Sequence, residues 1–142
     1  MNQIFREDER ELLQLCAEDQ ISTVPHNSLA AGRLSRRPGE TSVRLRQDSF
    51  AQGKYGGTAA QDALVIERVA EVADRLQTTM TAVSLAWLIT KVTSPIASAT
   101  KPHHVDGMAE AADLKPTPAD IAYLEEPYVP HAPVGMMAQK RS

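Results

Sequence analysis

The amino-acid sequence predicts an α/β protein, in which helices pack on short parallel strands, and two observations support this class. The first is that amphipathic helical patterns alternate along the chain with two short β-branched runs, at 21–25 and 93–99. Helices that alternate with strands in this way are typical of βα units built on a parallel sheet. The second is that aromatic residues make up 4% of the chain although 42% of it is hydrophobic. A core of Leu, Val, Ile and Ala favours helices on strands over an aromatic-rich β-sandwich.

The first predicted helix runs from Phe5 to Asp19. Its first turn carries acidic side chains, which complement the positive end of the helix dipole, at Glu7, Asp8 and Glu9. Its apolar face at helical spacing consists of Leu12, Leu13, Leu15 and Cys16. We interpret Cys16 as a packing thiol and not as a nucleophile, because apolar surroundings make a thiol inert. The following run, from Ile21 to Pro25, is short and ends at a proline, and it predicts a strand.

Both helical and strand periodicity are lost from Asn27 to Ala60, and this stretch (27–60) is expected to be one long loop. It contains glycines at positions 32, 39, 53, 56 and 57 and five arginines between Arg33 and Arg46. A loop of this length inside a compact chain is usually functional or mobile. Its arginines are expected to cover a solvated surface rather than bind nucleic acid, because the whole chain has a net charge of −3.

Two helices are predicted in the middle of the chain. Asp62 is expected to cap the first, which runs to about Leu76 and has one apolar face made of Val65, Val69, Val72 and Leu76. The second, from Met80 to Lys91, is apolar nearly all round, so we expect it to be buried on several sides. Trp87 lies within this second helix and is expected to belong to the core.

The last part of the chain combines a strand, two helices and a tail. After the strand at 93–99, Pro102 begins a helix whose inward face is expected to consist of Val105, Met108, Ala109 and Ala112. Thr117, Pro118 and Asp120 resemble a capping box at the start of a short last helix. The tail, residues 127–142, contains several prolines and is expected to run extended over the surface.

Composition narrows the classes of protein to which the chain can belong. Its 142 residues fit one domain, 1–142, and a net charge of −3 argues against a general nucleic-acid binder. No apolar stretch approaches the roughly 20 residues that a membrane span needs, and the charged start has no secretory signal. The single cysteine permits no internal disulfide, and the adjacent His103 and His104 lack the spacing of a metal site. We therefore expect a cytoplasmic protein without a metal.

Several ordered motifs together resemble a known family. They are the stretches Phe5 to Glu11, Ser28 to Leu34, Ala82 to Leu88, Pro95 to Pro102, Leu114 to Glu126, and Glu125 to His131. In this order they look like the C-terminal part of a bacterial aldo-keto reductase, of the subgroup whose chains end in an EEPYVPH tail. The resemblance implies the C-terminal portion of a TIM-type (β/α)8 barrel, helix-rich and not complete, because such a barrel takes about 250 residues.

The resemblance also implies an activity, the reduction of carbonyls to alcohols with NADPH. The family's catalytic tetrad (Asp, Tyr, Lys, His) lies on earlier strands, so we expect no catalytic residue here and no turnover by this chain alone. Tyr55, Tyr123 and Tyr128 are expected on a loop, an outer helix and the tail, where they cannot replace the family's proton-donating tyrosine.

The family's cofactor positions do fall within this sequence. His26 matches the aromatic ring that stacks on the nicotinamide, although the family more often has Trp or Tyr there. The residues that match the pyrophosphate-lining positions are Asn27, Ser28, Leu29 and Gly32. The region that holds the adenosine 2′-phosphate and the adenine offers Ser98, Thr100, Lys101 and His104. Lys101 stands where the family has an arginine, and it would act as a point charge without a bidentate fork. His103 is expected to face solvent.

A second function remains open from the sequence, a non-catalytic oligomeric α/β protein derived from a barrel fragment, with at most residual nucleotide or anion binding. An incomplete barrel would expose strand edges at 21–24 and 95–99 and an apolar face of the helix from Met80 to Lys91. We therefore expect either a homo-oligomer, with its contact at that helix or at the strand edges, or a partner chain that supplies the N-terminal half.

Overall fold

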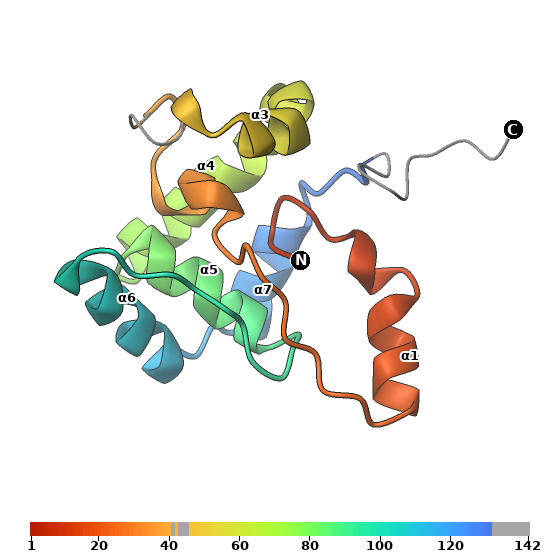
Figure 1. The fold of residues 1–142 in the computed structure, drawn as a ribbon. Coiled ribbons are helices and arrows are strands. Elements are labelled where there is room, and N and C mark those ends of the chain that lie inside the picture. Colours follow the sequence, from red (N-terminus) through yellow and green to blue (C-terminus); the bar gives the residue numbers. More distant parts are fainter. Residues whose placement is uncertain (41, 43–45, 132–142) are drawn as a thin grey trace, which may run out of the picture.

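The computed structural model describes residues 1–40, 42 and 46–131, and this part of the chain is built from helices (Figure 1). The α-helices are α1 (Leu12–Glu18), α3 (Ser49–Tyr55), α4 (Ala59–Arg75), α5 (Met80–Ile89), α6 (Pro102–Asp113) and α7 (Pro118–Glu125). Short 3₁₀ helices are η1 (Glu7–Glu9), η2 (Ala30–Ser35) and η3 (Gly56–Thr58). Figure 1 shows α5 near the middle of the molecule, with α6 and α1 towards opposite sides.

Helix α5 forms the centre of the core. The Oγ1 of Thr79 accepts a hydrogen bond from the amide of Ala82 at 3.0 Å and so caps the helix at its start. From Ala82 to Leu88 every side chain is buried, and Trp87 is completely inaccessible. Burial of this helix confirms the expectation drawn from its apolar pattern. The related expectation, that it leaves an apolar face exposed for an oligomer contact, is wrong because α4, α6 and η2 cover it.

Helix α4 begins earlier than the sequence predicted, at Ala59, with Thr58 at the N-cap position. Asp62 is therefore not a cap but lies in the first turn of the helix, where it is buried and accepts a hydrogen bond from the Thr58 hydroxyl at 2.7 Å. The expected apolar face is confirmed, because Val65, Val69 and Val72 are all buried in the main core.

Neither predicted strand forms among the described residues, and in their place two extended segments lie side by side. The carbonyl oxygen of Thr23 accepts hydrogen bonds from the amides of Thr93 at 3.1 Å and Ser94 at 3.2 Å. The amide of Ile96 donates to the carbonyl oxygen of Pro25 at 3.0 Å. Pro25 and Pro95 have no amide hydrogen to donate, so the pairing cannot continue as a regular ladder. The described residues thus contain paired extended segments but no strand of the implied barrel.

The N-terminal helix is shorter than predicted, since η1 and α1 replace a continuous helix from 5 to 19. Cys16 faces the protein and is buried, as expected for a packing thiol. Leu13 is partly buried against the main core, whereas Leu12 is 51% and Leu15 is 53% exposed, so the predicted apolar face is covered in part. Together with Ile21 and Val24, which are also more than half exposed, Leu12 and Leu15 form the exposed apolar set of α1 and the segment after it.

Helix α6 begins at Pro102 as predicted, and of the four residues of its expected inward face Met108 alone packs against the core, where it is partly buried. Gly107 and Ala111 are buried against α5, whereas Val105 is 55% exposed and Ala109 and Ala112 are exposed. A Cβ atom at position 107 would lie 3.3 Å from Cγ2 of Thr81, so the absence of a side chain allows the two helices to approach closely. Close helix contact, and not the hydrophobicity of single residues, therefore determines which face is buried.

The stretch 27–60, predicted to be one long loop, contains η2, α3 and η3. Asp48 caps α3 by accepting a hydrogen bond from the amide of Ala51 at 2.8 Å. Residues 41 and 43–45 lie outside the described part of the chain. The capping box at the start of α7 is confirmed, because the Thr117 and Asp120 side chains each accept a hydrogen bond from the other residue's amide.

The first residues of the predicted tail are packed into the protein, whereas 132–142 lie outside the described residues. His131 is buried, and its Nε2 lies 2.9 Å from Oδ1 of Asp62. Its amide donates to Oε1 of Glu7 at 2.8 Å, and the Tyr128 hydroxyl donates to the same oxygen at 2.7 Å. The tail therefore joins the N-terminal segment to α4 instead of running freely over the surface.

No helix in the part of the chain that the structure describes is long and apolar enough to cross a membrane. Within the same residues, no group of three or more His, Cys, Asp or Glu side chains is arranged to hold a metal ion.

Candidate functional site

A cavity of about 760 Å³, here called the main cavity, lies between the segment 26–40 and the helices α5 and α6. Eight of the nine residues that the sequence assigned to a cofactor line it, namely His26, Asn27, Ser28, Leu29, Gly32, Ser98, Thr100 and His104. Lys101, the ninth, does not line this cavity. The structure thus brings together two segments that are far apart in the sequence.

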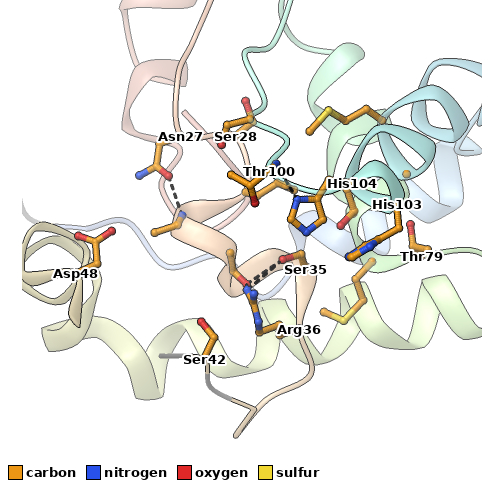
Figure 2. Close-up of a pocket in the computed structure, with 18 of the residues that line it drawn as sticks. Asn27, Ser28, Ser35, Arg36, Ser42, Asp48, Thr79, Thr100, His103 and His104 are labelled. Carbon is orange, nitrogen blue, oxygen red and sulfur yellow. Dashed lines mark hydrogen bonds between the residues drawn. The ribbon is translucent and has the colours of Figure 1, made fainter. Parts of the chain in front are cut away.

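The first wall of the main cavity is fixed by hydrogen bonds within the protein (Figure 2). Asn27 has a φ of 62°, and its Oδ1 accepts a hydrogen bond from the amide of Ala31 at 2.7 Å. Its Nδ2 donates to the hydroxyl of Tyr55 at 2.9 Å. The Ser28 hydroxyl is buried and donates to the carbonyl oxygen of Ile96 at 2.8 Å. Both side chains therefore hold the wall in place through protein contacts.

Gly32 continues this wall in a conformation that favours glycine. Its φ is 90°, and a Cβ atom there would lie 2.3 Å from Nη1 of Arg36. That nitrogen donates to the carbonyl oxygen of Gly32 at 2.7 Å, so the guanidinium lies across the space that a side chain would fill. The glycine thus allows the close approach of a cation to the wall.

Arg36 is a site residue that the sequence analysis missed, because all five arginines of this stretch were expected to face solvent. It lines the main cavity, and Figure 2 shows it near Ser35 and His104. Arg33 is also not a solvent-facing residue, since its guanidinium lies 5.2 Å from the ring centre of Tyr55. No signal in the sequence separates Arg36 from the other arginines of the stretch, because its place beside Gly32 depends on the folded turn.

The second wall of the main cavity consists of the start of α6 and the residues before it. The Nδ1 of His104 accepts a hydrogen bond from the amide of Thr100 at 3.2 Å. The ring of His103 lies edge-on to it, with 4.5 Å between ring centres, and His103 itself is exposed as expected. Desolvation and the nearby charges of His103, Lys101 and Arg36 lower the pKa of His104. A neutral His104 with Nδ1 as acceptor carries its proton on Nε2, which is then a donor.

Three predicted residues lie at the edge of the site. His26 and Ser98 line the main cavity but are exposed. Lys101 is the N-cap residue of α6, but its side chain makes no capping hydrogen bond. It is exposed to solvent and does not line the main cavity. Arg36 lines the main cavity and donates to the carbonyl oxygen of Gly32, so it supplies a cation at this wall where Lys101 does not.

The three tyrosines all have polar partners within the protein. Tyr55 does not lie on a loop, as the sequence suggested, but on α3, where it is fully buried and its hydroxyl accepts hydrogen bonds from Asn2 and Asn27. The Tyr123 hydroxyl donates to Glu71, and that of Tyr128 donates to Glu7. In this arrangement each hydroxyl stabilises the fold.

The residues around the main cavity fit a phosphorylated ligand. Its volume lies in the range of roughly 300–1,000 Å³ that is typical of ligand sites. Arg36 offers a planar guanidinium, which matches the geometry of a phosphate, and His104 offers an imidazole on the other wall. Glu40 and Asp48 also line the cavity and give it an acidic side, which suits hydroxyl or amide donors of a ligand.

Known proteins are similar to this chain over most of its length. The sequence profile of the Aldo/keto reductase family matches residues 1–128. Two fungal aldo-keto reductases, from Metarhizium robertsii and Fusarium vanettenii, are 37% and 33% identical over 130 residues, which are 91% of this chain and 35% of each relative. The versiconal hemiacetal acetate reductase of Aspergillus parasiticus is 34% identical over 135 residues, which are 92% of this chain and 39% of that protein.

The chain therefore spans between 35% and 39% of the length of these curated relatives. The relatives are fungal, so they do not confirm the bacterial subgroup that the tail motif suggested. Because the family profile covers almost all of the residues that the structure describes, the chain belongs to the aldo/keto reductase family.

Proposed function

We propose that this chain is the C-terminal, cofactor-binding portion of an aldo-keto reductase that reduces carbonyls to alcohols with NADPH. In this proposal the nucleotide lies in the main cavity, with the nicotinamide near His26 and the adenosine end near α6. The observation that supports it most strongly is the convergence of eight of the nine assigned residues on one cavity from two distant segments. NADPH supplies the hydride for carbonyl reduction when it is bound.

Each residue of the cavity has a distinct role in this proposal. Gly32 has no side chain, and this absence leaves the space in which the Arg36 guanidinium lies against the wall. Arg36 takes the role of phosphate cation that the sequence assigned to Lys101, because it lines the cavity and Lys101 does not. His104 donates from Nε2 to a ligand oxygen while Thr100 fixes the orientation of the ring.

The proposal predicts that the chain binds NADPH more tightly than NADH. A charge-assisted hydrogen bond is worth about 1.5–3 kcal/mol, so the 2′-phosphate should improve the affinity by about tenfold or more. Isothermal titration calorimetry of both nucleotides measures this difference. Arg36→Gln should remove most of the preference, whereas Arg10→Gln should keep it, because Arg10 pairs with Glu7 far from the cavity lining. Equal affinities for the two nucleotides, or no binding of either, would contradict the proposal.

We also propose that the chain associates with a second protein surface, either another copy of itself or a chain that supplies the N-terminal half of the barrel. The support comes from two members of the exposed apolar set of α1 and the following segment, Leu15 and Ile21, which are 53% and 56% exposed. The other two members, Leu12 and Val24, line a separate cavity. Leu15 and Ile21 replace α5 as the contact.

Light scattering of the purified chain should therefore give a mass above the 15.5 kDa of a monomer. Leu15→Lys should shift the mass to that of the monomer, because a charge would face the apolar partner. Val105→Lys on α6 is a matched control, since Val105 is 55% exposed and lies outside the set. A folded wild-type monomer at all concentrations would rule out self-association, and the complementing N-terminal half would then be the partner to test.

A further inference from the structure

We infer that a second cavity, of about 410 Å³, binds a small ligand that has an apolar body and a carboxylate, and that the carboxylate pairs with the ammonium group of Lys54. This site goes beyond the proposed function, because it needs no nucleotide and shares a single lining residue, His26, with the main cavity. It is formed where α1, α3 and the paired extended segments meet.

The walls of the second cavity are mainly apolar. Most of its lining comes from Phe5, Leu12, Leu13, Val24, Pro25 and Val92. Leu12 and Val24 are 51% and 53% exposed, so a ligand that covered them would remove apolar surface from water. A lining of this kind favours an aromatic or branched aliphatic body over a polar one.

Lys54 is the cation that makes this cavity selective for an anion. It lies in the last turn of α3, and its Nζ is 4.3 Å from the ring centre of Phe5 and 5.5 Å from that of Tyr55. No described carboxylate lies within 4.0 Å of this Nζ, so the ammonium is held by aromatic faces and not by an ion pair. Burial lowers the pKa of Lys54, and the charge of Asp8 opposes this effect. A partly desolvated cation without an anionic partner is costly, and a ligand carboxylate would offset that cost.

The carboxylate in the lining, Asp8, does not reverse this preference. Its Oδ2 lies 3.2 Å from the amino nitrogen of Met1, so its charge is already paired. The other titratable side chain in the lining, His26, lies at the exposed edge of the cavity. The unpaired charge that faces a ligand in this cavity is therefore positive, which favours an anion over a cation.

The test uses the full chain without nucleotide and two probes of the same shape, phenylacetate and its uncharged amide, phenylacetamide. Isothermal titration calorimetry should show that phenylacetate binds about tenfold or more tightly than phenylacetamide. Lys54→Met should reduce this preference to less than about twofold, while Lys54→Arg should keep it. Lys115→Met is the matched control, because Lys115 is exposed on another part of the surface and lines neither cavity.

Three outcomes would each overturn the inference: equal affinities for the two probes, no binding of either probe, or an unchanged preference in a folded Lys54→Met variant. If Lys54→Met does not fold, the ¹⁵Nζ resonance of Lys54 in the wild-type chain takes its place, since phenylacetate and not phenylacetamide should shift it. A failure of NADPH to bind would leave these results unaffected, because no nucleotide is present in the test.

Discussion

Replacing Trp87 with Ala is expected to lower the free energy of unfolding by about 3–5 kcal/mol, the usual loss for a fully buried aromatic side chain. Trp87 is completely inaccessible in the last turn of α5, and its Nε1 donates to Oε1 of Glu125 at 2.9 Å. The same carboxylate pairs with Lys91 at 2.7 Å and with Arg6 at 3.3 Å. The substitution therefore creates a cavity in the core and also removes one donor from the group that joins α7 to the N-terminal segment.

Urea denaturation followed by circular dichroism measures this loss as a shift of the midpoint at constant slope. Trp87→Phe is the matched control, because it keeps an aromatic ring in the core and removes the N–H donor. It should cost less than the Ala variant, by about 1–3 kcal/mol for the hydrogen bond and the smaller ring. A free energy of unfolding for Trp87→Ala less than about 1 kcal/mol below that of the wild type would contradict the core position of α5.

Replacing His131 with Ala is expected to destabilise the chain by about 3–5 kcal/mol, because it breaks a buried pair and leaves one charged partner behind. The side chains of His131 and Asp62 are each 3% exposed, and 2.9 Å separates their Nε2 and Oδ1 atoms. Without the imidazole, Asp62 keeps the hydroxyl of Thr58 as its hydrogen-bond donor. Burial raises the pKa of Asp62 and outweighs the hydrogen bonds and nearby charges that lower it. The ionised carboxylate is therefore costly in the folded chain.

The double variant Asp62→Asn/His131→Ala isolates the buried charge, since Asn is uncharged at every pH. At pH 7 the double variant should be more stable than His131→Ala, because its position 62 is neutral. An acid whose pKa is raised by folding destabilises the folded state above that pKa. The difference in stability between the two variants should therefore disappear as the pH falls through the raised pKa of Asp62. Denaturation midpoints of both variants between pH 4 and pH 7 check this, and a difference that does not change with pH would contradict it.

Helices with local signals were predicted well from the sequence. Thr117 and Asp120 form the expected capping box, and Pro102 begins α6 as expected. These features depend on residues within one helical turn, so the sequence contains the information directly. The strands depend on partners far along the chain, and Pro25 and Pro95 interrupt the pairing between them. The inward face of α6 was predicted in part: Met108 packs against the core as expected, but contact with Thr81 favours Gly107, which hydrophobic periodicity ignores.

In the candidate site, too, residues within recognisable motifs were predicted, whereas a residue placed by the fold alone was missed. The resemblance to the family identified eight residues that line the main cavity, because the motifs around Ser28 and Thr100 follow one another in the family's order. Arg36 was missed because nothing in its immediate sequence separates it from the other arginines of the stretch. Its position depends on the left-handed turn at Gly32 and on the absence of a Cβ atom there, whose place the guanidinium takes; both become visible in three dimensions.

The turn that shapes the first wall has a consequence for affinity. Asn27, Ala30 and Ala31 have φ values of 62°, 49° and 56°, in a region that costs a residue other than glycine roughly 1–2 kcal/mol. The hydrogen bonds of Asn27 to Ala31 and Tyr55 hold this conformation when the chain folds. The wall is thus preorganised: folding, and not ligand binding, bears the loss of conformational entropy. A ligand that enters the main cavity keeps more of its contact energy as affinity than it would on a wall that had to be ordered first.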